Sequence, residues 1–280
     1  MLDKRLAIVS GKGGVGKSAV ATGIALMAQR HGLRVLAVEM ESGGGLAAHF
    51  GVGELEFEPR EVRPGLHAMH MVRSEALLEY LQLQLRLPGM GRFGAVARAF
   101  DALATAAPAV REIVTIGKIL WEVREDRWDL VVVDAPPTGQ IASYLRAPRS
   151  IAELVATGRI RNQSDWMEAT LADPDLTQLI LVTLAEELPT SETVETIDWV
   201  TETKVVGTPT VITNRILDEI TVKTPAGIAG DMVTLHKSLW SEQQRWVKRL
   251  PPDLTLPHLF GLFTPGEVAA HLSDDLEVLA

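Results

Sequence analysis

A glycine-rich run close to the start of the chain constrains the fold more than any other feature of the sequence. The run reads Ser-Gly-Lys-Gly-Gly-Val-Gly-Lys-Ser over residues 10–18; it follows a strand-like segment at 6–9 and opens a helix-like segment at 18–31. Glycines let the backbone curl until successive N–H groups converge on an anion, and the dipole of the following helix also favours negative charge. Because a phosphate-binding loop requires this position between a strand and a helix, the run predicts such a loop.

Each residue type in the loop suits one part of a bound nucleotide. The residues expected to contact it are Gly11, Gly13, Gly14, Val15, Gly16, Lys17, Ser18 and Ala19. We expect the Lys17 ammonium to reach the β- and γ-phosphates and the Ser18 hydroxyl to hold Mg²⁺, a hard cation that takes few protein ligands. Lys12 is a second lysine in the same loop, and as a plain loop residue it would be solvated.

Short β-branched runs alternate with helix-like stretches along most of the chain. The strand-like runs lie at 6–9, 35–38, 66–71, 130–133, 179–182, 210–213 and 256–259, and the helical stretches at 18–31, 190–203, 231–250 and 267–279. This alternation predicts an α/β fold with a doubly wound, mostly parallel sheet and helices on both faces. We expect the helix at 231–250 to pack on the sheet and to present a basic outer face; the alternative is that its basic and tryptophan residues form a surface for a membrane or a partner.

No linker or internal repeat divides the 280 residues, so we expect a single domain over 1–280. Residues 73–127 are too many for a simple connection between two strands, and they predict a helical insertion within that domain. Such an insertion forms a lid, a dimer contact or a client surface, or it adds helices to the sheet. The leucine and methionine residues between 77 and 100 suit either a client groove or core packing.

Composition excludes several classes of function. The chain has 27 lysine and arginine residues against 36 aspartate and glutamate residues, a net charge of −9, so it lacks the basic surface that binds nucleic acid. The absence of cysteine excludes disulfides and thiolate zinc sites. No run approaches the ~18 apolar residues of a membrane-spanning helix, and no apolar core of a signal peptide follows residues 1–5. We therefore expect a cytoplasmic protein without direct membrane insertion.

A carboxylate ends the apolar run at 130–133. The sequence Leu-Val-Val-Val-Asp-Ala-Pro-Pro-Thr-Gly over 130–139 indicates a buried strand, a terminal Asp134 and a stiff turn. Ligands of doubly wound sheets bind outside the carboxyl ends of the strands, so we expect Asp134 to face the phosphate-binding loop. Asp134 would then hold Mg²⁺ together with Ser18.

Two glutamates, Glu39 and Glu41, end the second strand-like run. Three glycines at 43–45 follow them, which favours a mobile loop. A carboxylate at this point is placed to orient an attacking water, or both acids are simply solvated at the strand end.

Two of these motifs together resemble a known group of proteins. A second lysine inside the phosphate-binding loop, here Lys12, is typical of the deviant Walker A (SIMIBI-class) P-loop ATPases. The run Asp-Ala-Pro-Pro-Thr-Gly at 134–139 resembles the switch II sequence Asp-Thr-Ala-Pro-Thr-Gly of their ArsA-like branch. Within that branch the chain is most similar to actinobacterial ArsA-like anion-transporting ATPases, which are related to the tail-anchored-protein targeting ATPases. The resemblance covers residues 5–50, 108–150 and 176–279.

The resemblance implies roles for individual residues. The catalytic set is Lys12, Lys17, Glu41 and Asp134. In this set Lys12 crosses to the nucleotide of a partner subunit, while Glu41 positions water and joins Ser18 and Asp134 as a metal ligand. Relatives carry aspartates where this chain has Glu39 and Glu41, so these carboxylates stand one methylene further from the backbone.

The resemblance also implies an adenine site. The run Val-Ile-Thr-Asn-Arg at 211–215 is similar to a segment whose asparagine reads the base, because an amide donates and accepts together. It implies base contacts by Asn214 and Arg215, and Pro265 lies in the segment that closes over the base.

The leading hypothesis is a Mg²⁺-dependent dimeric ATPase that binds ATP and ADP and couples hydrolysis to a change of shape and to the handling of a hydrophobic protein client. The dimer is either a homodimer or a heterodimer with a related ArsA-like subunit. Two alternatives stay open. One is a ParA- or MinD-like positioning ATPase, which the acidic composition disfavours; the other is a nucleotide-binding subunit of a heteromeric complex that does not hydrolyse ATP.

Overall fold

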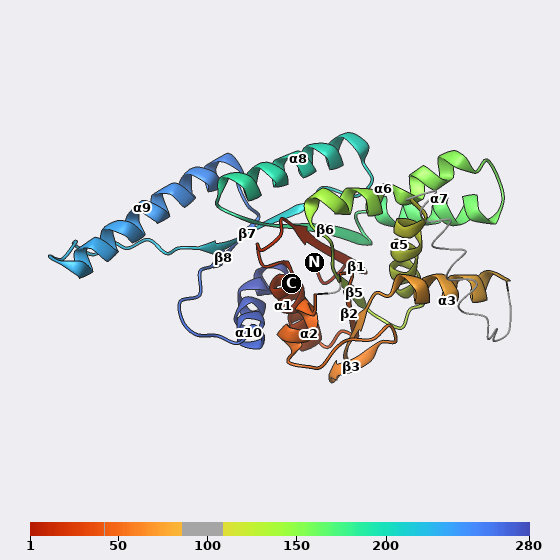
Figure 1. The fold of residues 1–280 in the computed structure, drawn as a ribbon, viewed down its shortest axis with the longest axis horizontal. Helices are drawn as coiled ribbons and strands as arrows, with labels where there is room; N and C mark the ends of the chain where they lie inside the picture. Colours follow the sequence, from red (N-terminus) through yellow and green to blue (C-terminus); the bar gives the residue numbers. More distant parts are fainter. Residues whose placement is uncertain (42, 86–108) are drawn as a thin grey trace.

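One eight-stranded sheet runs through the part of the chain that the computed structural model describes, residues 1–41, 43–85 and 109–280 (Figure 1). Its strands are β1 (Leu6–Gly11), β2 (Val35–Glu39), β3 (Arg60–Arg63), β4 (Leu66–His70), β5 (Leu130–Asp134), β6 (Thr177–Leu184), β7 (Thr210–Ile216) and β8 (Leu254–Pro257). Their order across the sheet is β3-β4-β2-β5-β1-β6-β7-β8. β3 runs antiparallel to β4, and the other neighbours are parallel. The predicted mostly parallel sheet is confirmed.

Helices cover both faces of the sheet, because the pleat sends alternate side chains of each strand to opposite sides. Leu6 and Ile8 of β1 join one apolar core, and Ala7 and Val9 join the other. The first core is covered by α3 (Arg73–Leu85), α5 (Ala109–Arg124), α6 (Thr138–Leu154), α7 (Arg159–Ala172) and α8 (Glu187–Thr203). The second is covered by α1 (Lys17–Arg30), α2 (Gly45–Phe50), α10 (Pro265–Asp275) and the 3-10 helix η1 (Leu276–Leu279). The predicted helices on both faces are therefore present (Figure 1).

The topology brings distant parts of the sequence to one edge of the sheet. Parallel strands end at the same edge, and β1 lies between β5 and β6 in the middle of the sheet. Asp134 is the register partner of Val9 on one side and of Glu39 on the other. Asn214 is the register partner of Leu184, near the same ends of β6 and β7. The loops after these strands therefore meet in one place, where doubly wound sheets bind ligands.

Some elements differ from the sequence pattern. β8 begins two residues before the predicted 256–259, and the pattern did not indicate β3, α2 or α7. β3 consists of Arg-Glu-Val-Arg, which carries no apolar alternation, and it pairs through the turn at Gly65, where φ is +75°. Short, charged edge strands of this kind lack the apolar pattern from which a strand is predicted.

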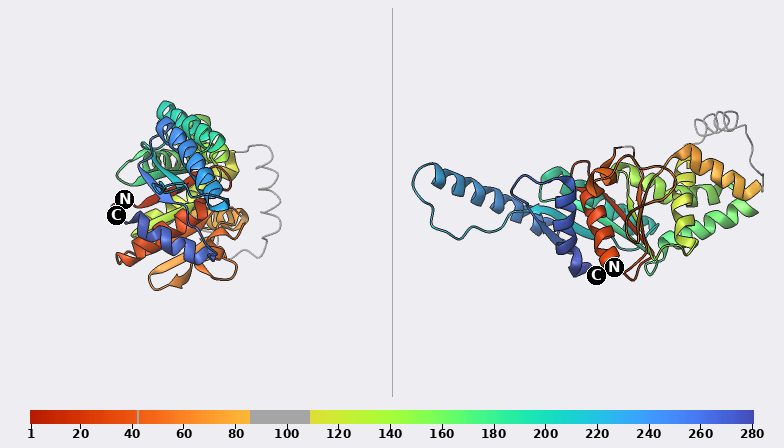
Figure 2. Two further views of the ribbon diagram at one scale, coloured as in Figure 1. Left: turned by 90° about the vertical axis from the view of Figure 1, so that its left-hand side faces the viewer. Right: turned by 90° about the horizontal axis from the view of Figure 1, so that it is seen from below.

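Helix α9 (Ile228–Arg249) corrects the expectation of a sheet-packing helix at 231–250. It projects from the end of the sheet beside β8 (Figures 1 and 2). Gly230 is the single buried residue among its 22, and Ile228, Met232, Leu235 and Leu239 are exposed. Apolar spacing indicates that a helix has an apolar face, but it does not identify the surface that the face meets.

Residues 73–127 contain α3 and α5, and residues 86–108 between these helices lie outside the described residues. Ala76 and Leu77 of α3 and Ile116, Ile119 and Leu120 of α5 join the first apolar core. A single domain over 1–280 with a helical insertion at 73–127 stays a prediction. Within the described ranges, none of the helices is both long enough and apolar enough to span a membrane.

Candidate functional site

The loop between β1 and α1 has a shape that favours glycine. Gly14 and Gly16 have φ values of +86° and +100°, in the region that other residues rarely adopt. A Cβ on Gly16 would lie 2.5 Å from Nδ2 of Asn214, and one on Gly11 would lie 2.0 Å from the carbonyl oxygen of Val182. The loop is therefore packed directly against β6 and β7. Gly11 and Gly16 leave no room for a side chain, and the positive φ at Gly16 also favours glycine.

Helix α1 starts at Lys17, so its N-terminus faces the loop. Gly16 is the N-cap and has no side chain to accept from the N–H groups of the first turn. Those N–H groups have no partner inside the helix, and the positive end of the helix dipole lies at the same point. The loop and helix together therefore form an anion-binding site.

Ser18 and Asp134 meet beside this anion site. Ser18 Oγ and Asp134 Oδ2 both border the space where a Cβ of Gly45 would stand. A Cβ on Gly45 would lie 2.5 Å from Ser18 Oγ and 3.4 Å from Asp134 Oδ2, so a larger residue would fill the space beside both oxygens. A hydroxyl and a carboxylate next to such a space fit Mg²⁺, which binds oxygen ligands and retains several waters.

Asp134 is more easily protonated than an ordinary aspartate. Burial raises its pKa from 3.8 to about 6, and Glu39 and Glu41 contribute in the same direction. The neighbouring Ser18 hydroxyl and the charge of Lys17 lower the pKa and so oppose this rise. A bound divalent cation would favour the ionised form, because it balances the nearby negative charge.

The two glutamates after β2 have different surroundings. Glu39 is 4% exposed; its Oε1 lies 3.4 Å from the Leu46 amide nitrogen and its Oε2 lies 4.0 Å from Nδ1 of His70. Glu41 is exposed, in the loop that leads to Gly45. Glu41 is thus the glutamate with access to solvent, and Glu39 is held within the protein.

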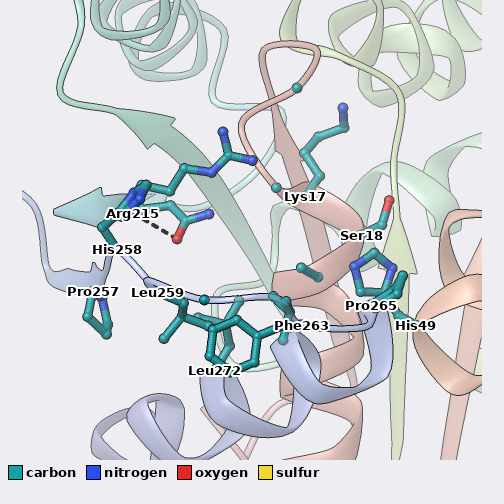
Figure 3. Close-up of a pocket in the computed structure, with 16 residues that line it drawn as sticks. Lys17, Ser18, His49, Arg215, Pro257, His258, Leu259, Phe263, Pro265 and Leu272 are labelled. Atoms are coloured by element: carbon teal, nitrogen blue, oxygen red, sulfur yellow. Dashed lines mark hydrogen bonds between the residues drawn. The ribbon is translucent and has the colours of Figure 1, made fainter.

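A cavity of about 530 Å³ opens next to the phosphate-binding loop (Figure 3). The residues that line it are Gly14, Gly16, Lys17, Ser18, Ala19, His49, Asn214, Arg215, Pro257, His258, Leu259, Gly261, Phe263, Pro265, Val268 and Leu272. Its volume is in the usual range for small-ligand sites. The cavity has Lys17 and Ser18 at one end and apolar side chains from the segment before α10 at the other, so it suits a ligand with a phosphate end and a flat apolar end.

Asn214 connects the cavity wall to the loop. Its Nδ2 donates a hydrogen bond of 2.8 Å to the Val15 carbonyl. Its Oδ1 accepts one of 2.9 Å from the Arg215 amide, which is the dashed line in Figure 3. Arg215 has a φ of +59°, which is uncommon outside glycine and turns the chain at the end of β7. Both predicted base-contacting residues therefore lie at the cavity, and Asn214 also holds the phosphate-binding loop in place.

Eight lining residues were not among the predicted ligand contacts: His49, Pro257, His258, Leu259, Gly261, Phe263, Val268 and Leu272. Phe263 lies two residues before Pro265, in the segment that was expected to close over the base. The Nδ1 atom of His49 lies 2.6 Å from the Gly45 carbonyl oxygen. The Phe263 ring packs edge to face on His271, with ring centroids 5.3 Å apart. Pro265, which was predicted, begins α10 behind a capping box formed by Thr264 and Glu267.

Lys12 lies outside the cavity that Lys17 and Ser18 line. Its ammonium pairs with the carboxylate of Glu192 on α8, and the second oxygen of Glu192 accepts a hydrogen bond of 3.1 Å from Thr138 Oγ1. Sequence reasoning gave Glu192 no role, because its partners are 180 and 54 residues away along the chain. The structure thus brings together most of the predicted site and places Lys12 apart from it.

The chain is similar to known proteins. A model of the anion-transporting ATPase family matches residues 4–169, which is more than half of the chain. ATPase BagA of Mycobacterium tuberculosis is 37% identical over 205 residues, which make up 69% of this chain but 60% of that relative. ATPase get3 of Schizosaccharomyces japonicus is 25% identical over 257 residues, 79% of this chain and 77% of that protein.

The match to the family model begins before β1 and extends into α7. It therefore includes the phosphate-binding loop, Gly45 and the strand that ends in Asp134. On this evidence the chain belongs to the ArsA-like family of anion-transporting ATPases.

Proposed function

We propose that this chain is a Mg²⁺-dependent ATPase that works as a dimeric switch. The observation that carries the proposal is the meeting of Ser18 and Asp134 beside an uncapped helix N-terminus and a cavity of about 530 Å³. The arrangement favours one orientation of ATP, with its phosphates on the loop and its base toward Asn214 and Phe263. The family relationship supports the same reading.

The phosphate end of the site performs the chemistry in this proposal. Loop N–H groups and the Lys17 ammonium stabilise negative charge on the transferred phosphoryl group. Ser18 and Asp134 would hold Mg²⁺, which would neutralise phosphate charge when bound. Glu41, the solvent-accessible glutamate after β2, orients the attacking water, and buried Glu39 supports the strand end beneath it.

The base end of the site selects the nucleotide. The Asn214 amide, held by Val15, presents a donor and an acceptor near the end of β7. Arg215 and Pro265 border the same space, and Phe263 offers a ring for stacking. These groups suit the edge and faces of adenine.

Lys12 provides the reason to propose a dimer. It belongs to the phosphate-binding loop but does not line the cavity of its own chain, and about a third of its side chain is exposed. A lysine in this position can serve the nucleotide of a facing subunit, where it would stabilise charge only after docking. The facing subunit is a second copy of this chain or a related ArsA-like chain.

An apolar cavity supports a hydrophobic protein client. It measures about 330 Å³, lies between α3, α5, α6 and α7, and is lined by side chains that include Leu77, Trp121, Trp166 and Met167. Of the stretch 77–100 that suggested a client groove, Leu77 and Tyr80 line this cavity, and 86–100 lies outside the described residues. Because α6 starts four residues after Asp134, a movement at the nucleotide site would reach the cavity through α6.

Phosphate release from Mg·ATP, followed as the protein concentration rises, tests the proposal. Sedimentation in ATP and in ADP gives the oligomeric state, and Lys17→Ala, which should lose nucleotide binding, is the control. Specific activity that rises together with dimer formation supports the dimeric switch. ATP binding without turnover at every concentration would indicate a non-hydrolysing subunit instead, and ATP-dependent cosedimentation with DNA or liposomes would indicate a positioning ATPase.

The client proposal has its own test at the rim of the apolar cavity. Ile160 lines the cavity and is 51% exposed, so Ile160→Glu would place a charge at its opening without disturbing the core. We expect this variant to bind a fluorescent apolar helical peptide about tenfold more weakly than the unaltered chain, while ATP turnover stays unchanged. Equal peptide binding by both proteins would remove the cavity from the proposal.

A further inference from the structure

A carboxylate on α8 holds the second lysine of the phosphate-binding loop within its own chain. Glu192 pairs with the Lys12 ammonium through Oε1 and accepts the hydroxyl of Thr138 through Oε2. Thr138 is almost fully buried, whereas the side chains of Lys12 and Glu192 are about one-third exposed. One side chain therefore links the phosphate-binding loop, α8 and residues 134–139, which we call switch II.

This junction is open to solvent on one side. A groove of about 450 Å³ runs between α6 and α8 and is lined by Thr138, Gly139, Ala142, Glu192, Glu195, Thr196 and Trp199. Glu195 lies one turn beyond Glu192 in the same groove, and the structure gives it no contact with Lys12. The two glutamates share a helix and a groove, but Glu192 alone of this pair reaches the loop.

The ion pair competes with any phosphate for Lys12. An ammonium that is paired with a carboxylate has to exchange that partner before it can bind a nucleotide on another subunit. A partly exposed ion pair is weak, so the phosphates of a docked nucleotide, which carry more charge, can displace the carboxylate. In a chain without a docked partner, Glu192 keeps Lys12 at α8.

We propose that Glu192 is a positioning residue that retains Lys12 in its own subunit and releases it when switch II moves. This inference rests on the proposed function, in which Lys12 acts across a dimer. Thr138 supplies the coupling, because its hydroxyl orients the Glu192 carboxylate toward Lys12. When nucleotide binding moves switch II, this hydrogen bond is lost and the hold on Lys12 weakens, so release of the lysine is linked to nucleotide state.

Glu192→Gln tests this role, with Glu195→Gln as the matched control. The glutamine keeps the size of the side chain and can still accept from Thr138, but it loses the charge that holds Lys12. We expect the protein concentration that gives half-maximal phosphate release to fall about fivefold in Glu192→Gln, and to stay unchanged in Glu195→Gln. The maximal rate should stay within about twofold, because neither glutamate lines the nucleotide cavity.

The rate of reductive methylation of Lys12 reports whether its ammonium is paired with Glu192, and the measurement does not require ATP hydrolysis. In nucleotide-free protein, Lys12 should be methylated several times faster in Glu192→Gln than in the unaltered chain or in Glu195→Gln, with Lys17 as the internal reference. Mass spectrometry of the loop peptide measures both lysines. A merely structural role of Glu192 would change thermal stability but neither the Lys12 labelling rate nor the half-activity concentration.

Two results would overturn the inference: equal labelling of Lys12 in all three proteins, or an unchanged half-activity concentration in an active Glu192→Gln enzyme. In a chain that hydrolyses no ATP, faster Lys12 labelling in Glu192→Gln still supports the retention of Lys12 by Glu192. The absence of ATP hydrolysis would then contradict the proposed ATPase function and leave the retention of Lys12 by Glu192 supported.

Discussion

Glu39 and Asp134 lie side by side at the ends of the parallel strands β2 and β5, where the register pairs them directly. They are 4% and 7% exposed, and the charge of Glu39 contributes to the raised pKa of Asp134. Burial and the like charge of Glu39 both disfavour ionisation of the Asp134 carboxylate. The register of the sheet therefore concentrates negative charge beside Ser18, and a divalent cation would balance it.

Removing the charge of Asp134 should stabilise the metal-free protein at neutral pH. The pKa of Asp134 is raised from 3.8 to about 6, so the folded state binds more protons than the unfolded state between these values and stability falls as pH rises through them. Asp134→Asn lacks this penalty, which amounts to at most about 3 kcal/mol for a shift of this size. Urea unfolding without Mg²⁺ should show a gain at pH 7.5 that shrinks toward pH 4, together with loss of Mg²⁺-dependent turnover. A gain of equal size at both pH values would contradict the assignment.

Asp129 provides a control in which stability depends on pH in the opposite direction, because its pKa is lowered and not raised. Its pKa is lowered to about 2, first by the hydrogen bond from the Arg34 side chain and then by the one from the Arg34 backbone amide. The stability that this contact contributes is present above pH 3.8 and is lost as pH falls through about 2. Asp129→Asn should therefore unfold at lower urea concentration at pH 7, and its deficit should disappear in strong acid. If the deficit persists there, Arg34 is not its cause.

Gly45 should be essential to the metal site, although it has no side chain. Its Cβ would lie 2.5 Å from Ser18 Oγ, so Gly45→Ala would displace the hydroxyl and narrow the space beside Asp134. We expect turnover to fall about 100-fold, as for other displacements of about 1 Å in active sites. Gly43→Ala is the matched control, since a Cβ there would have no neighbour within 4 Å. Similar activity in both variants would show that ATP hydrolysis does not depend on the space beside Ser18.

Asn214 should contribute to both stability and nucleotide choice. Asn214→Ala leaves the buried Val15 carbonyl without its donor, which should cost about 1–3 kcal/mol in the free energy of unfolding. It should also reduce the preference for ATP over GTP in equilibrium binding, since the amide faces the base in the proposed orientation. A variant that loses stability but keeps its full preference for ATP would limit Asn214 to holding the loop.

Glu122 should be among the most sensitive positions for folding. Its side chain is fully buried and accepts from Lys118 at 2.7 Å, Arg127 at 2.7 Å and Trp128 Nε1 at 2.8 Å. Glu122→Ala leaves the buried Lys118 ammonium without one of its partners, and we expect it to cost about 3–5 kcal/mol in urea unfolding. Glu125→Ala, at an exposed position of the same segment, should change stability by less than about 0.5 kcal/mol.

The phosphate-binding loop and the sheet could be predicted because their signals are local. Residues 10–18 are contiguous, and the conformation of Gly14 and Gly16 follows from their own lack of a side chain. The buried strands are short apolar runs, and Asp134 ends one of them, so its place at the carboxyl edge followed from the parallel topology. Asn214, Arg215 and Pro265 were found through family resemblance rather than through any local property.

The sequence by itself determined the alternation of strands and helices and the loop that ends at Ser18, because backbone preference and hydrophobic period act over a few neighbouring residues. The excess of acidic residues follows directly from the composition. Only the tertiary structure decided that Glu192 meets Lys12, that Gly45 borders Ser18 and Asp134, and that α9 leaves the sheet. These contacts join residues that lie far apart along the chain. Their distances depend on how every intervening element packs, and no local pattern contains that information.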